Sequence, residues 1–166
     1  MKSKHCKLES AKCKIKFSNT VWVCVMLTID GSHGEGGGQI LRSSLSLSIL
    51  TGTPVRIENI RARRQKPGLQ PQHLMSVKAA GAICGAMFKG AAIGSTTLYF
   101  EPKEVRAGKY HFTIGTAGAT GLVLQTVHLP LALRGESASE VVIDGGTHRS
   151  EEHTSELQSP YVISYA

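Results

Sequence analysis

The fold is decided by residues 26–52, which read MLTIDGSHGEGGGQILRSSLSLSILTG. Leu27-Thr28-Ile29 predicts a short apolar strand that ends at Asp30-Gly31. A glycine-rich loop follows at Gly34–Gly38, and leucines and isoleucines then recur near the helical period until Gly52, a natural helix stop. Each apolar face needs a partner layer, so this order of strand, loop and helix predicts α/β packing.

Similar patterns continue toward the C-terminus. Alternating residues predict a strand over 54–60, and Pro71 suits the first turn of a second helix. The inner stripe of that helix is predicted to be Leu74, Val77, Gly81 and Cys84. The remaining predicted elements are strands over 96–100 and 110–114, a helix over 118–133 and a strand over 141–143. We therefore predict a two-layer α/β (α+β) fold of repeated βαβαββ units, with two helices on a four-stranded sheet and a truncated second repeat.

The composition is that of an ordinary globular protein. The chain has 166 residues, of which 41% are hydrophobic and 19% charged, so one domain with tails is expected. Four cysteines are too few for a disulfide-stapled scaffold. No apolar stretch reaches the roughly 20 residues of a membrane helix, and no signal peptide is evident. We expect a cytoplasmic protein with reduced thiols and no membrane association.

The two ends of the chain differ from its middle. Residues 1–25 hold six lysines and one glutamate, and we expect them to form a disordered basic tail. Residues 149–166 lack any hydrophobic period. Arg149–Ser159 and Ile163–Ala166 match one reading frame of a common sequencing adapter, so we expect the segment to be adapter-derived and without function. An ordinary polar tail is the alternative.

The glycine-rich loop places backbone N–H groups at the start of a helix, where an anion is stabilised. A tight turn uses the same kind of glycines, so they alone decide nothing. Glu35 is more informative, because a carboxylate beside a bound phosphate needs a cation between them, which points to a divalent metal. An exposed glutamate that favours the helix dipole is the alternative interpretation.

Several further side chains could bind phosphate, and guanidinium groups do so bidentately. Arg42 lies one turn into the first helix. Gln72 and His73 begin the second helix, and Gln125 is a polar residue inside the apolar third helix, where a buried amide needs a hydrogen-bond partner. The loop after the second strand carries Arg61, Arg63, Arg64 and Lys66. The alternatives are a solvated basic loop, a structural histidine and a glutamine bonded to backbone.

The stretch Ile29–Arg42 resembles the N-terminal signature of the RNA 3'-terminal phosphate cyclases. IRARRQKPGL at residues 60–69, followed by Gln72-His73-Leu74, resembles the second signature block of that family. Shorter segments at the expected intervals are Ile93-Gly94-Ser95, Gly118 to Gln125 and Gly145-Gly146-Thr147. By this resemblance, residues 26–148 are the N-terminal part of the cyclase catalytic domain.

The resemblance implies an enzyme of the ligase class that uses ATP and a divalent metal, Mg²⁺ or Mn²⁺. A histidine of the enzyme becomes adenylylated, AMP passes to the 3'-phosphate of RNA, and the neighbouring 2'-hydroxyl attacks to give a 2',3'-cyclic phosphate. By motif position, Glu35 would help hold the metal and Gln125 would contact ATP. The residues implied to bind the RNA end and phosphates are Arg42, Arg61, Arg64, Gln72 and His73.

The nucleophilic histidine belongs to the C-terminal half of the family, so no catalytic residue is assigned in this chain. His148 and His153 are not in that sequence context, and we expect the chain alone to be inactive. A non-catalytic, cyclase-like scaffold that binds RNA in ribosome assembly is one alternative, against which the intact Glu35, Arg42 and His73 argue. A small α/β module for an anionic metabolite is another.

Overall fold

The chain alternates strands and helices in the predicted manner. The computed structural model describes residues 26–34, 37–114, 120–145 and 161–164, so the predicted tail at 1–25 lies outside the described residues. The elements are β1 (Leu27–Asp30), α1 (Gly38–Thr51), β2 (Val55–Glu58), α2 (Pro71–Cys84), β3 (Met87–Lys89), β4 (Leu98–Glu101), β5 (Lys109–Thr113), α3 (Thr120–Arg134), β6 (Glu140–Asp144) and β7 (Tyr161–Ser164).

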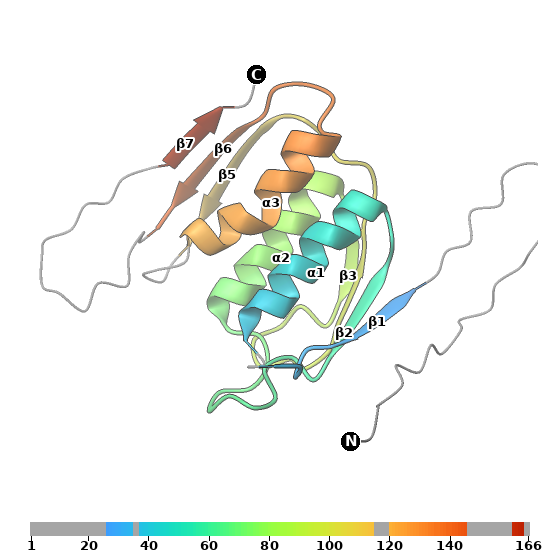
Figure 1. Ribbon diagram of the computed structural model, residues 1–166. Coiled ribbons are helices and arrows are strands. Elements are labelled where there is room, and N and C mark those ends of the chain that lie inside the picture. Colours follow the sequence, from blue (N-terminus) through green and yellow to red (C-terminus); the bar gives the residue numbers. More distant parts are fainter. Residues whose placement is uncertain (1–25, 35–36, 115–119, 146–160, 165–166) are drawn as a thin grey trace, which may run out of the picture.

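The first six elements form a βαβαββ unit. β1 and β2 lie parallel, with Ile29 opposite Ile57, and α1 supplies the crossover that parallel strands need. β4 runs antiparallel to β2 and β3, which gives the order β1-β2-β4-β3. α1 and α2 lie together on one face of this sheet (Figure 1). The predicted four-stranded sheet with two helices is confirmed.

Local signals fix the ends of both helices. Gly52 ends α1 in the left-handed conformation, and its N–H donates to the carbonyl of Ser48. α2 begins at Pro71 with a reciprocal capping arrangement between Gln70 and His73. Most of the inner stripe predicted for α2 is buried, although Leu74 is only half-buried.

The sequence prediction is wrong about which segment forms the fourth strand of this sheet. β3 supplies it, whereas the predicted strand over 110–114 forms β5 in a second sheet of order β5-β6-β7. β3 has only three residues and all are exposed, so it lacks the alternation by which a half-buried strand is identified. The second repeat therefore begins at β5, one strand earlier than predicted.

The second repeat reproduces the start of the first. β5 and β6 are parallel and α3 connects them, as α1 connects β1 and β2. β7 then runs antiparallel to β6, as β4 does to β2. β7 lies within the segment expected to be adapter-derived, and its pairing leaves the origin of residues 149–166 a prediction.

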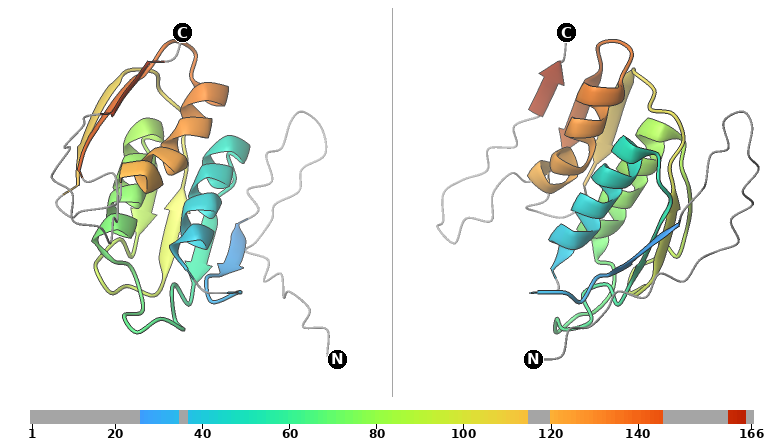
Figure 2. Two further views of the ribbon diagram at one scale, coloured as in Figure 1. Left: turned by 60° about the vertical axis from the view of Figure 1, so that its left-hand side comes forward. Right: turned by 45° about the vertical axis from the view of Figure 1, so that its right-hand side comes forward.

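One hydrophobic core joins the two repeats. α3 packs against both α1 and α2, and the second sheet lies beyond it (Figure 2). None of the helices in the described ranges is long and apolar enough to cross a bilayer. Fully buried core side chains come from α1, α2, α3, the sheets and the loops, among them Leu45, Ile57, Val77, Phe100, Val127 and Ile143.

A proline within α3 sets one contact of the α1–α3 interface. Pro130 has no N–H, so the carbonyl of Thr126, four residues earlier, has no helical donor from that position. The buried hydroxyl of Ser46 on α1 donates to this carbonyl at 2.8 Å. Farther along the helices, the Arg134 guanidinium donates to the carbonyl of Leu50 at the end of α1. These hydrogen bonds fix the position of α3 along α1.

We expect Ser46→Ala to lower the free energy of unfolding by about 1–3 kcal/mol, because it leaves the Thr126 carbonyl buried without a donor. In the Pro130→Ala background a helical N–H returns to that carbonyl, so the same change should cost less than about 1 kcal/mol. Urea denaturation of the four proteins measures both costs. An equal cost in the two backgrounds would contradict the replacement of the Ser46 hydroxyl by the helical N–H as donor to the Thr126 carbonyl.

Candidate functional site

The first turns of α1 and α2 lie against each other at one end of the molecule. A Cβ built on Gly38 would lie 2.2 Å from Nε2 of His73 and 3.1 Å from Nη1 of Arg42. Such a distance leaves room for no side chain, so the backbone at the start of α1 directly contacts the imidazole. The first N–H groups of both helices, which lack helical partners, are therefore gathered in one place.

His73 is a buried, neutral member of this cluster. Its side chain is 4% exposed, and its Nδ1 accepts a hydrogen bond from the backbone N–H of Gln70 at 3.1 Å. The proton of the neutral ring consequently sits on Nε2, the atom nearest Gly38. Burial, reinforced by the charges of Arg61 and Arg42, lowers the pKa of His73 to about 4. At neutral pH this side chain can donate one hydrogen bond.

Arg42 is a buried cation held by neutral groups. It is 8% exposed. Its Nε donates to Oε1 of Gln125 at 3.2 Å, and its Nη2 donates to Oε1 of Gln39 at 2.7 Å. Burial lowers the pKa of Arg42, and no carboxylate within the described residues forms an ion pair with it. A buried guanidinium whose described hydrogen-bond partners are all neutral favours an incoming anion.

Two further arginines approach from the loop between β2 and α2. Arg61, in a left-handed conformation with φ of 54°, donates from Nη1 to the carbonyls of Lys66 and Gly68 at 2.7 and 3.2 Å. Partial burial, then the charge of Arg64, lowers the pKa of Arg61. Nη2 of Arg64 lies 3.5 Å from the position of a Cβ on Gly37. Arg64 thus lies beside the start of α1, and Arg61 lies close enough to His73 for its charge to lower the pKa of that imidazole.

Asp30 joins the two loops that carry these groups. Its Oδ1 accepts hydrogen bonds from the backbone N–H and the hydroxyl of Ser32 at 3.0 and 2.8 Å, and from Nδ2 of Asn59 at 3.3 Å. The Ser32 N–H contributes most to lowering the pKa of Asp30. The end of β1 is therefore hydrogen-bonded to Asn59, which leads into the loop that carries Arg61 and Arg64.

The structure brings most of the sequence-predicted site residues together, and two remain apart or undescribed. The grouped residues are Arg42, Arg61, Arg64, His73 and Gln125. No described contact joins the side chain of Gln72 to the group; its backbone carbonyl accepts from the Ser76 hydroxyl at 3.2 Å. Glu35 lies outside the described residues. Within the described ranges there is no group of three or more His, Cys, Asp or Glu side chains that could hold a metal ion.

Sequence reasoning missed Gln39 and the contact between Gly38 and His73. A signal for Gln39 exists, because residues three apart on a helix are neighbours and Gln39 precedes Arg42 by three. No sequence signal pairs Gly38 with His73, since their contact depends on how α1 and α2 pack.

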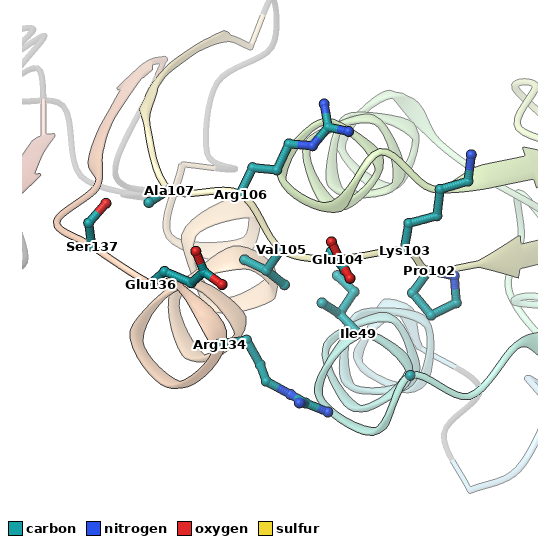
Figure 3. A pocket seen from close by; sticks show the side chains of 11 residues that line it. Ile49, Pro102, Lys103, Glu104, Val105, Arg106, Ala107, Arg134, Glu136 and Ser137 are labelled. Carbon is teal, nitrogen blue, oxygen red and sulfur yellow. The ribbon is translucent and has the colours of Figure 1, made fainter. Parts of the chain in front are cut away.

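A hollow of about 700 Å³ lies at the opposite end of α1 and α3 from this cluster (Figure 3). It contains charges of both signs, so it does not select an anion as the helix N-termini do. Its charged lining residues are Lys103, Glu104, Arg106, Arg134 and Glu136.

The α/β repeat places a cationic cluster at two helix N-termini, an arrangement that suits an anion. The particular family follows from sequence comparison: the model of the family RNA 3'-terminal phosphate cyclase matches residues 33–163. The chain belongs to this family.

Curated relatives named RNA 3'-terminal phosphate cyclase are similar to most of the chain. One from Methylococcus capsulatus is 58% identical over 130 residues, covering 74% of this chain and 36% of the relative. One from Caldivirga maquilingensis is 59% identical over 124 residues, covering 74% and 34%. One from Nostoc punctiforme is 55% identical over 130 residues, covering 74% and 37%. The chain spans about a third of the length of these relatives.

The burial of neutral His73 makes stability depend on pH. Its pKa is about 4 in the folded chain against 6.5 ordinarily, so the unfolded chain takes up the proton first as the pH falls. This contribution to stability is complete above about pH 6.5 and is lost toward pH 4, by an amount on the order of 1–3 kcal/mol after solvent screening. His73→Gln should remove this part of the pH dependence. Urea denaturation between pH 7 and pH 4 measures how the free energy of unfolding depends on pH. An equal dependence for the two proteins would contradict the prediction.

Proposed function

We propose that the chain supplies phosphate- and RNA-end-binding residues of an ATP-dependent RNA 3'-terminal phosphate cyclase. The proposed reaction converts an RNA 3'-phosphate to a 2',3'-cyclic phosphodiester through enzyme-adenylate and RNA-adenylate intermediates. The observation that carries the proposal is Arg42, a buried cation with neutral hydrogen-bond partners beside two helix N-termini. Membership of the family and the names of its relatives supply the chemistry. The proposal places this reaction in the cytoplasm, where ATP and RNA are present.

The cluster suits a terminal phosphoryl group in three respects. Arg42 and Arg64 supply guanidinium groups, which match phosphate oxygens in geometry and charge. His73 supplies one neutral N–H, so it donates to phosphate without adding a charge that burial would penalise. Arg61 is held by two backbone carbonyls and contributes positive potential.

The two glutamines have different parts in the proposal. Oε1 of Gln125 is engaged by Arg42, which leaves its amide nitrogen to donate to ATP. Gln72 begins α2, and its contact with the RNA end is proposed from motif position alone.

ATP fits the residues that are described, because its phosphates need the same cationic, N–H-rich surroundings as the RNA end. Mg²⁺ or Mn²⁺, when bound, would neutralise charge on the phosphates. The proposed metal ligand is Glu35, which lies outside the described residues.

We expect Arg42→Ala to weaken binding of an RNA oligonucleotide with a 3'-phosphate by about 10- to 100-fold, the loss that follows from removing a charged hydrogen bond. The same oligonucleotide with a 3'-hydroxyl should be affected far less. Fluorescence anisotropy with both oligonucleotides at fixed salt measures the difference.

Lys78→Ala is the matched control for the loss of one positive charge, because Lys78 is an exposed residue of α2. An equal loss for both oligonucleotides with Arg42→Ala would contradict a phosphate site. Binding by the unaltered chain that ignores the 3'-phosphate would instead favour the RNA-binding scaffold.

We expect the chain by itself to form no covalent adenylate, because none of its residues matches the nucleophilic histidine signature of the family. Incubation with Mg²⁺ and ATP labelled in the α-phosphate, followed by denaturing electrophoresis, tests this. The Methylococcus capsulatus relative is the positive control. Acid-labile label retained by this chain would contradict the expectation.

A further inference from the structure

The guanidinium group of Arg42 is held along one edge. Arginine carries five N–H donors in a plane, and Nε and Nη2 share an edge of that plane. Nε donates to Gln125 and Nη2 donates to Gln39, so two amide carbonyls occupy this edge. Nη1 is at the other side of the group, 3.1 Å from the position of a Cβ on Gly38.

Gln39 is itself oriented. Its Nε2 donates to the hydroxyl of Ser43 at 2.9 Å, which turns its Oε1 toward Arg42. Gln39, Arg42 and Ser43 all lie on the first turns of α1, whereas Gln125 comes from α3. One holding contact is therefore local to the helix, and the other depends on the packing of the two repeats.

We propose that Gln39 is a positioning residue which, with Gln125, turns Arg42 so that its Nη1 end faces Gly38 and His73. The terminal phosphoryl group then meets the Nη1 end of the guanidinium plane, beside the contact between the α1 backbone and the imidazole. This inference rests on the proposed function and names the residue that sets the approach of the phosphate.

The exposure of Gln39 separates positioning from a structural role. Gln39 is exposed, and its bond to Arg42 spans one helical turn. Removing an exposed side chain of this kind changes stability little. A loss of phosphate recognition without a loss of stability would therefore come from a change in the site and not from a weakened fold.

The test compares binding of a labelled RNA oligonucleotide with a 3'-phosphate to that of the same oligonucleotide with a 3'-hydroxyl. Gln39→Ala should lower the preference for the 3'-phosphate by about 3- to 10-fold, the worth of one hydrogen bond. Gln39→Glu should lower it more than about 10-fold, because the new carboxylate would pair with Arg42 and repel phosphate. Thr51→Ala, which trims an exposed polar side chain at the far end of α1, should leave the preference unchanged.

Two further measurements distinguish positioning from direct contact. In the Arg42→Lys background, Gln39→Ala should change the remaining preference by less than about 2-fold, because the residue acts through the guanidinium group. By NMR, hydrogen exchange at Arg42 Nε should be faster in Gln39→Ala than in the unaltered chain. Reduced preference with unchanged exchange would assign Gln39 to the phosphate itself and overturn the proposal.

The outcomes also separate this inference from the proposed function. If Arg42→Ala reduces the 3'-phosphate preference and Gln39→Ala does not, the positioning role is wrong and the phosphate site remains. If neither variant reduces it, the phosphate site is wrong as well.

Discussion

The site depends on one buried positive charge at the interface of two helices. Arg42 belongs to the first repeat, and one of the two amides that hold it, Gln125, belongs to the second. A buried guanidinium needs hydrogen-bond acceptors, and an isolated first repeat would offer it one fewer. The proposed anion site is therefore complete only when α3 packs on α1, so anion binding and the assembly of the two repeats would depend on each other.

Much of the fold could be predicted because its signals are local. Gly52 ends α1, Pro71 begins α2, and a short apolar strand precedes the glycine loop as expected. The residues of the cationic cluster are also predictable, since motif positions single out Arg42 and His73. The helix N-termini then bring these side chains into one place, as the glycine-rich loop had suggested.

The rest required non-local information. β3 is too short and too exposed to carry a periodic signal, and which sheet β5 joins is decided by pairing with β6 some thirty residues later. One of the two acceptors of Arg42, Gln125, likewise depends on packing because it is distant in sequence, whereas Gln39 is a neighbour on the same helix. The neutral state of His73 depends first on its burial and then on the nearby charges of Arg61 and Arg42, none of which composition reveals.

Pro130 and Ser46 form a reciprocal pair whose consequence reaches beyond stability. The buried carbonyl of Thr126 needs one hydrogen-bond donor. That donor is either the Ser46 hydroxyl on α1 or the backbone N–H that a residue other than proline would have at position 130. Substitutions at the two positions should consequently be linked. Once Pro130 is replaced, the helix supplies the donor and Ser46 can change with little loss of stability. If Ser46 changes first, the Thr126 carbonyl is left without a donor and the fold is destabilised. We therefore expect the order of change to be directional, with Pro130 replaced before Ser46.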